Sequence, residues 1–325
     1  MKKIISILLA LIVTVSAAAI AVSADGLRVL GDYTDDGKVT SDDAIFLLRS
    51  VLFPESYSLS AFGDFDGNGE VGSDDAIFLL RHVLFPDSYV LKTTAPYSEG
   101  LEYSLDNGYA WITGPGSFEG TDLNVPPEID GHPVIGVVSH AFQDAAVTSV
   151  TLPAGVTTVK RGAFIDCESL VAVYLPEGIA VLDYVAFERC RSLPSAVIPA
   201  GVTTIEDSLF ADCISLTSVA IHSGVTHIGK WAFSECDSLV TVTVPDGVTY
   251  INDCVFNSCD SLKSVYLPAG ITGIGSWAFD MCQGLETIYF AGTRAQWESI
   301  EKGYRWDHYA GDYVPGGYKV VCADD

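Results

Sequence analysis

Apolar and polar positions recur with a period of 23 residues over residues 134–290. Phenylalanine marks the period at Phe164, Phe187, Phe210, Phe233, Phe256 and Phe279. Cysteine follows three residues later at Cys167, Cys190, Cys213, Cys236, Cys259 and Cys282. A leucine and a glycine recur with the same spacing, and each period contains one short run of alternating apolar residues. A fixed period with one short strand in each turn predicts a solenoid.

The repeated unit Ala-Phe-x-x-Cys-x-Ser-Leu resembles the BspA-like class of leucine-rich repeats, and the resemblance covers about residues 100–322. The first repeat departs from the pattern, because it begins at Phe142, has Ala145 in the cysteine position and is one residue short. Atypical terminal repeats are expected, since they face solvent. We expect an aromatic C-terminal cap over 291–325, in which tryptophan and tyrosine side chains seal the last repeat, namely Trp297, Tyr304, Trp306 and Tyr309.

An N-terminal cap is predicted over residues 99–133, after a linker at 92–98. Residues 101–105 and 109–112 alternate in polarity on either side of Asp106-Asn107-Gly108. Asn-Gly between two such runs is a strong signal for a β-hairpin. We expect this hairpin to cover the open end of the solenoid.

A second repeated pattern lies nearer the N-terminus, where one unit occurs twice with a spacing of 32 residues. Each copy places oxygen-bearing side chains at loop positions 1, 3, 5 and 12, with glycine at position 6. Ca²⁺ requires about six to eight oxygen ligands on a sharply turned backbone, so each loop is a candidate site for one calcium ion. Position 7 contributes its backbone carbonyl in such a loop. The candidate ligands are Asp32, Thr34, Asp36, Lys38 and Asp43 in the first loop, and Asp64, Asp66, Asn68, Glu70 and Asp75 in the second.

Each loop is followed by an apolar helical segment, 43–53 or 75–85, that ends before Pro54 or Pro86. This loop-helix doublet resembles type I dockerin over about residues 27–91. The resemblance implies a small all-α module that binds two calcium ions and docks onto a cohesin domain of a scaffold protein. The docking residues that it implies are Ser41, Asp42, Arg49 and Phe53, and Ser73, Asp74, Arg81 and Phe85.

Two positions depart from the dockerin pattern. Thr34 stands where the family usually has Asp or Asn, so we expect the first calcium site to be the weaker one. Asp42 and Asp74 stand where well-known members have threonine, which leaves the type of cohesin partner open. The predicted fold class is therefore α+β with several domains, an all-α calcium-binding doublet and a leucine-rich-repeat solenoid.

The 325 residues carry a formal net charge of −25. Such a charge disfavours binding to nucleic acid and to anionic membranes. Residues 1–24 have two lysines, an apolar run and a Val-Ser-Ala end, which is typical of a signal peptide. We therefore expect a secreted protein that does not bind a membrane after cleavage and that reaches the cell surface through its scaffold. An uncleaved membrane anchor is the alternative.

Six of the eight cysteines share one position of the 23-residue period. We expect buried free thiols there rather than disulfides, because successive turns place them in one column. A column also disfavours tetrahedral zinc. Cys254 and Cys322 lie outside the column, and whether they pair is left open. The six histidines are scattered and the chain has no catalytic constellation, so we expect no enzyme activity.

One position of each predicted strand should face away from the core, since side chains alternate along a strand. This column contains Thr151, Tyr174, Val197, Ala220, Thr243, Tyr266 and Tyr289. Its tyrosines form a candidate ligand face, although tyrosine is also common in strands for conformational reasons. A second column, Trp231-Cys254-Trp277, is interpreted as packing.

These patterns predict a secreted, non-catalytic component of a cellulosome-type assembly that is associated with polysaccharide degradation. The doublet would dock onto a cohesin, and the solenoid would bind an unidentified protein or glycan. One alternative is a surface adhesin in which calcium only makes the N-terminal module rigid. The other is an unrecognised hydrolase.

Overall fold

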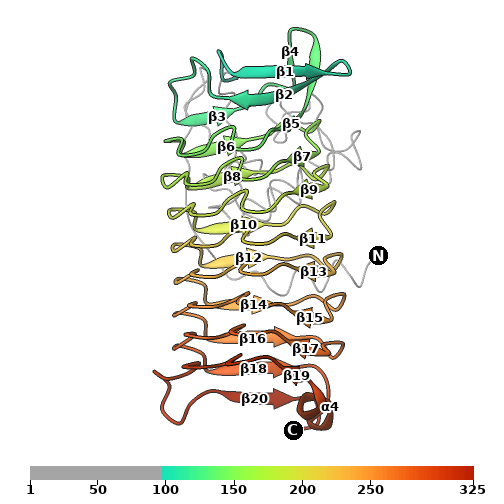
Figure 1. Ribbon diagram of the computed structural model, residues 1–325, viewed down its shortest axis with the longest axis vertical. Helices are drawn as coiled ribbons and strands as arrows, with labels where there is room; N and C mark the ends of the chain where they lie inside the picture. The colour runs from blue at the N-terminus through green and yellow to red at the C-terminus, as the bar shows by residue number, and fades with distance from the viewer. Residues whose placement is uncertain (1–96) are drawn as a thin grey trace, which may run out of the picture. The chain divides into compact units, whose positions relative to one another are not determined.

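The computed structural model describes residues 97–325, which form a solenoid of short strands stacked in two rows (Figure 1). The chain divides into two units, Met1–Ala95 and Pro96–Asp325, and the described residues belong to the second. The predicted all-α calcium-binding doublet lies outside the described residues. Each turn contributes two strands rather than the single strand predicted. The second row gives little signal in the sequence because most of its strands are only two residues long.

From β8 (Ala172–Tyr174) onward the first row carries the longer strand of each turn, and its outer side holds the predicted tyrosine column. Its strands are β3 (Asp122–Asn124), β6 (Ser149–Thr151), β8 (Ala172–Tyr174), β10 (Ser195–Val197), β12 (Ser218–Ala220), β14 (Thr241–Thr243), β16 (Ser264–Leu267), β18 (Thr287–Phe290) and β20 (Lys319–Cys322). Pairing within this row is parallel, in the groups β3-β6-β8, β10-β12 and β14-β16-β18-β20.

The second row runs beside the first and is also parallel. Its strands are β2 (Tyr109–Gly114), β5 (His132–Val137), β7 (Thr158–Val159), β9 (Val181–Leu182), β11 (Thr204–Ile205), β13 (His227–Ile228), β15 (Tyr250–Ile251), β17 (Gly273–Ile274) and β19 (Glu301–Lys302). In the central repeats the pairing register equals the sequence period, as when Ser195 pairs with Ser218 and Thr204 with His227. Equivalent residues of successive repeats therefore lie side by side, which turns each sequence position into a column on the surface or in the core.

A column of phenylalanine rings fills the core behind the tight turns. Neighbouring rings from Phe142 to Phe279 have centroids 5.3 to 5.9 Å apart and are nearly parallel, with interplanar angles of 3° to 17°. All of these side chains are buried. The spacing is close to the distance between paired strands, so the rings stack because the strands do.

The tight turn around each phenylalanine contains two residues in the left-handed region. They lie two residues before the ring and two residues after it, as Trp231 (φ 54°) and Glu235 (φ 59°) do around Phe233. This conformation costs a residue with a side chain roughly 1 kcal/mol or more. Hydrogen bonds to the next turn hold it in place, for example from the Trp231 amide to the Asp253 carbonyl, 3.2 Å, and from the Glu235 amide to the Asn257 carbonyl, 2.8 Å.

The two ends of the solenoid are built differently. The hairpin lies where the Asn-Gly signal predicts it, with β1 (Glu102–Asp106) antiparallel to β2. The short β4 (Glu128–Ile129) pairs with β5, also antiparallel. The hairpin is also part of the second row, because β2 pairs with β5 in parallel.

The C-terminal end contains the one helix among the described residues, α4 (Arg294–Ser299). Thr293 and Gln296 form a capping box at its start, and this Thr-x-x-Gln signal is visible in the sequence although no helix was expected there. Trp297 is buried, and Trp306 packs edge-on against Phe279, as the predicted cap requires. Tyr304 and Tyr309 are exposed and do not seal the last repeat, which corrects the prediction for these two residues.

Candidate functional site

Two tyrosines on the outer side of the first row form the candidate site, which we call the tyrosine pair. Tyr266 on β16 and Tyr289 on β18 are directly paired across the strands. Their ring centroids are 4.7 Å apart with an interplanar angle of 8°, and the side chains are 43% and 36% exposed. Val265 and Ile288 alternate with the tyrosines and are buried. Strand alternation therefore directs the rings to solvent while the strands stay anchored in the core.

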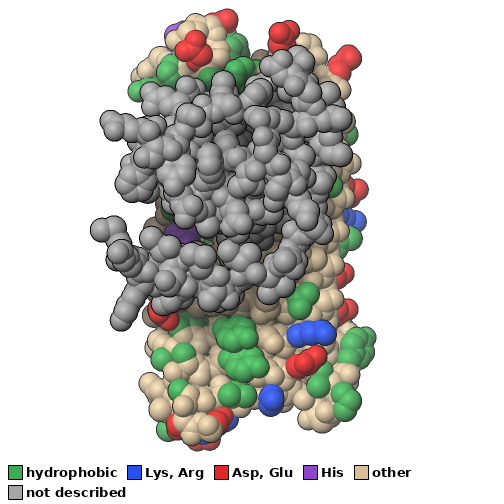
Figure 2. Space-filling model, turned by 180° about the vertical axis from the view of Figure 1, so that it is seen from behind, with side chains coloured by type: hydrophobic (Ala, Val, Ile, Leu, Met, Phe, Trp, Pro, Cys, Tyr) green, Lys and Arg blue, Asp and Glu red, His purple; other side chains and the backbone are tan. Residues whose placement is uncertain are grey.

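The surroundings of the tyrosine pair are mixed in character. Thr243 pairs with Tyr266 on one side and is exposed, and Val321 pairs with Tyr289 on the other and is half-buried. Just before the same two strands, Lys263 and Glu286 approach each other, with Nζ and Oε1 3.9 Å apart. Figure 2 shows hydrophobic side chains gathered beside positive and negative groups at the C-terminal end of this face.

The predicted column is not uniformly exposed. Thr151 and Tyr174 are buried, Tyr174 being only 8% exposed, and Val197 and Ala220 are half-buried. Alternation sets the side of the sheet on which a side chain lies, whereas its exposure depends on everything that surrounds it. The prediction that Tyr174 faces solvent is therefore wrong, and we place the candidate site at Tyr266 and Tyr289.

The cysteine column lies inside the solenoid, and all eight cysteines of the chain are free and buried. Each of the six column thiols donates a hydrogen bond to the carbonyl of a phenylalanine one repeat earlier, as from Cys213 Sγ to Phe187 O, 3.3 Å, and from Cys282 Sγ to Phe256 O, 2.9 Å. Burial raises the pKa of the column thiols from Cys167 to Cys259, to about 12 for Cys167. Buried neutral thiols are poor nucleophiles and poor metal ligands, so the column is structural. Cys254 and Cys322 do not pair with each other.

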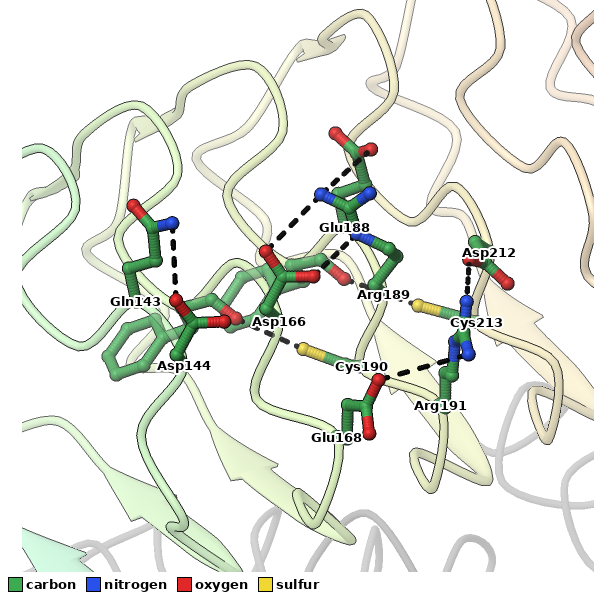
Figure 3. Close-up of polar contacts among 12 residues, drawn as sticks. Gln143, Asp144, Asp166, Glu168, Glu188, Arg189, Cys190, Arg191, Asp212 and Cys213 are labelled. Carbon is green, nitrogen blue, oxygen red and sulfur yellow. Dashed lines mark hydrogen bonds and ion pairs between the residues drawn. The ribbon is translucent and has the colours of Figure 1, made fainter.

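Ion pairs cross the turns on the outer side of the phenylalanine column (Figure 3). Arg189 binds Asp166 through two nitrogens, with Nε–Oδ1 2.5 Å and Nη2–Oδ2 3.2 Å. Arg191 binds Asp212 at 2.6 Å. Desolvation raises the pKa of the neighbouring Glu188 carboxyl. Both arginines thus form ion pairs with carboxylates of adjacent turns. These ion pairs link the repeats rather than forming a catalytic site.

Comparison with known proteins decides the family. A model described as "BspA type Leucine rich repeat region" matches in six copies, at residues 136–210 and 182–301. Together these ranges span more than half of the 325 residues. The chain belongs to the BspA-type leucine-rich-repeat family. No curated protein matches the chain significantly.

Solved structures show the same fold as these BspA-type repeats. A leucine-rich-repeat protein of T. pallidum is 28% identical, with a TM-score of 0.54, and the match covers 59% of this chain and 91% of that one. A leucine-rich-repeat protein of Bacteroides ovatus is 20% identical, with a TM-score of 0.50, and the match covers 71% of both chains. The second likeness concerns the fold alone.

A second aromatic surface on the BspA-type repeats corrects the sequence-based interpretation. The sequence suggests that Trp231 and Trp277 pack on the convex side of the solenoid, yet they are 45% and 39% exposed. Both have left-handed backbone, with φ of 54°, as does the buried Cys254 between them, with φ of 56°. Tyr304, 63% exposed, packs edge-on against Trp277 with a centroid distance of 5.6 Å. We call Trp231, Cys254, Trp277 and Tyr304 the aromatic ridge.

Among the described residues, one group of possible metal ligands occurs, formed by Cys322, Asp324 and Asp325 at the C-terminal end of the repeats. Its carboxylates are already engaged. Asp325 pairs with Arg294 and accepts a hydrogen bond from the Cys322 amide, 2.7 Å, and Asp324 accepts one from the Arg294 amide, 2.7 Å. The group therefore closes the end of the repeats. Within residues 97–325 no helix is long and apolar enough to cross a membrane.

The predicted calcium ligands and docking residues, from Asp32 to Phe85, lie outside the described residues. Their assignments therefore stay predictions from the sequence.

Proposed function

We propose that the repeat domain is a protein-binding module whose contact surface is centred on the tyrosine pair. The observation that carries this proposal is the exposure of two stacked rings on strands whose other side is fully buried. Tyrosine supplies a large amphipathic contact area at low cost in side-chain entropy, and it is enriched among the residues that dominate binding energy. Stacking restricts the two rings further before any partner arrives.

The geometry favours a protein partner over a glycan at this surface. The rings are stacked face to face along the solenoid axis, so each ring covers one face of the other and presents its edge and hydroxyl group to solvent. A sugar packs best on an open ring face, whereas a protein can use ring edges, hydroxyl groups and the nearby charges of Lys263 and Glu286.

For the N-terminal residues we propose calcium-dependent docking onto a cohesin of a secreted scaffold. The support is the duplicated loop-helix pattern and its resemblance to type I dockerin. The two copies suggest two nearly equivalent docking faces, one with Asp42 and Arg49 and the other with Asp74 and Arg81. In this proposal the chain is a secreted adaptor without enzyme activity that brings the partner of its repeats to the scaffold of a polysaccharide-degrading assembly.

Capture experiments test the two surfaces separately. The purified full chain is immobilised and exposed to the native secretome with calcium or with excess chelator. We expect the tyrosine-pair partner to be lost with Tyr266→Ala/Tyr289→Ala and kept with Tyr109→Ala, which removes a similarly exposed tyrosine from β2. Capture of the same proteins by the double variant and by the wild type would refute binding at the tyrosine pair.

The second experiment measures the binding of the chain to a cohesin captured from the same secretome. We expect chelator to abolish its binding, and alanine changes at Asp42 and Arg49, or at Asp74 and Arg81, to weaken it little. All four changes together should abolish it. If one pair of changes alone removes all binding, the two-way docking proposal fails and only one face acts.

A further inference from the structure

The aromatic ridge has the chemistry of a second binding surface, separate from the tyrosine pair. We propose that it binds an extended, uncharged β-1,4-linked polysaccharide, whose sugar rings pack on the exposed indoles of Trp231 and Trp277. This binding does not depend on the proposed function, since it involves different residues on a different side of the solenoid.

The backbone that carries the ridge is strained. Trp231, Cys254 and Trp277 all have φ between 54° and 56°, the left-handed region that disfavours large side chains. The equivalent position of an earlier repeat is Gly162, which adopts this conformation without strain. The same conformation occurs at this position in the other repeats, at His140, Val185 and Ser208, where hydrogen bonds to the next turn hold it. The regular turn therefore places Trp231 and Trp277 at one repeated position of the surface.

The spacing of the two indoles suits a disaccharide repeat. Trp231 and Trp277 occupy the same position two repeats apart, and the phenylalanine column beside them advances by 5.8 and 5.4 Å over these repeats. The backbone positions of the two tryptophans are therefore roughly 10 Å apart along the stack of repeats, twice the distance between paired strands. In an extended β-1,4-linked chain every second sugar presents the same face, and this disaccharide repeat is close to that separation. Cys254 between them is small and buried.

A polar column runs beside the ridge. Asp207, Lys230, Asp253 and Ser276 each directly precede a residue of the ridge position. Lys230 Nζ pairs with Asp253 Oδ2 at 2.8 Å, and Asp253 Oδ1 accepts a hydrogen bond from the Ser276 amide at 2.9 Å. The column thus offers hydrogen-bonding groups to sugar hydroxyls, and its lysine is already neutralised by a carboxylate rather than free for an anionic ligand.

The shape of the surface distinguishes a glycan from a protein as the occupant. Trp231 and Trp277 share one repeat position, and the polar column occupies the position directly before it, so the two columns run side by side along the stacked repeats. A protein interface needs a broad apolar centre surrounded by a polar rim. A narrow aromatic file with polar groups alongside matches a polymer whose apolar ring faces and hydroxyl groups alternate.

The test is affinity electrophoresis of the full chain in native gels that contain hydroxyethylcellulose or glucomannan. Dextran, whose linkages are α-1,6, serves as the control polymer. The test variant is Trp231→Asn/Trp277→Asn, because asparagine tolerates left-handed backbone and the variant should therefore fold. Tyr266→Ala/Tyr289→Ala removes two aromatic side chains elsewhere and serves as the matched control, and circular dichroism checks that both variants are folded.

We expect the β-1,4-linked polymers to retard the wild type and the tyrosine variant. The retardation of the tryptophan variant should be weaker by a factor of about ten or more. Cellohexaose should also quench and shift the tryptophan fluorescence of the wild type. This change should come from the two ridge tryptophans, since the three other tryptophans lie outside the ridge. Equal retardation of both variants, retardation in dextran, or no retardation of the wild type would overturn the proposal. Loss of a captured secretome protein by the tryptophan variant, with no loss of glycan binding, would overturn it in favour of a protein ligand.

Discussion

The phenylalanine column makes a quantitative prediction about the interior of the solenoid. Phe210 stacks on Phe187 and Phe233, with centroid distances of 5.7 and 5.9 Å, whereas Phe142 at the end of the column stacks on Phe164 alone among the described residues. Both side chains are at least 98% buried, so burial itself contributes similarly at the two positions. The change to leucine should therefore differ between them mainly by one ring contact.

The magnitudes follow from the contacts. Each aromatic pair contributes about 0.5–1.5 kcal/mol beyond buried area. The smaller leucine side chain costs roughly 1 kcal/mol more in lost burial and in the void that it leaves. We expect Phe210→Leu to lower the free energy of unfolding by about 2–4 kcal/mol. For Phe142→Leu we expect about 1.5–2.5 kcal/mol.

Urea unfolding of the full chain, followed by circular dichroism, measures both variants against the wild type. The slopes of the unfolding transitions should agree, so that the midpoints report stability. Phe233→Leu, a second interior position with two ring neighbours, should match Phe210→Leu. A loss at Phe142 equal to or larger than the loss at Phe210 would show that ring stacking does not stabilise the column.

Three further predictions concern thiols, backbone strain and calcium. Burial raises the pKa of Cys167 from 9.0 to about 12. The contribution of its neutral thiol to the free energy of unfolding is therefore complete below pH 9 and is lost as the pH rises to about 12. The urea midpoint of the wild type should fall over this range, and that of Cys167→Ala should fall less steeply. Val185→Gly should raise the free energy of unfolding by about 0.5–1 kcal/mol, because it removes a β-branched side chain from left-handed backbone (φ 54°). The control Val181→Gly, in β9, should lower the free energy of unfolding. A lower free energy of unfolding in both variants would contradict the inferred strain at Val185. Calorimetric titration of the chelator-treated chain should detect two bound calcium ions, and the site with Thr34 should be the weaker one. Asp32→Ala and Asp64→Ala should each remove one of the two ions. Unchanged calcium binding in both variants would exclude the loops as calcium sites.

The sequence determined the period, and the period determined the columns. A strict 23-residue repeat places equivalent residues in register on neighbouring strands, so buried phenylalanines, free buried cysteines and a side-by-side Tyr266 and Tyr289 were all predictable. The N-terminal hairpin was also predictable, because Asn107 and Gly108 set its turn locally. Each of these features depends on local chemistry or on repetition, and both can be seen in a single chain.

Only the tertiary structure decided which columns face solvent. The two-residue strands of the second row carry too little alternation to be recognised, and they exist because neighbouring turns offer them hydrogen-bonding partners. Trp231 and Trp277 lie on left-handed turns and are exposed, and large apolar residues give no sign of either feature in a sequence. The burial of Tyr174, in the same column as the exposed Tyr266, depends on the surroundings of each side chain in the folded chain. A repeat fixes which residues become neighbours, whereas the access of solvent to them is set by the whole fold.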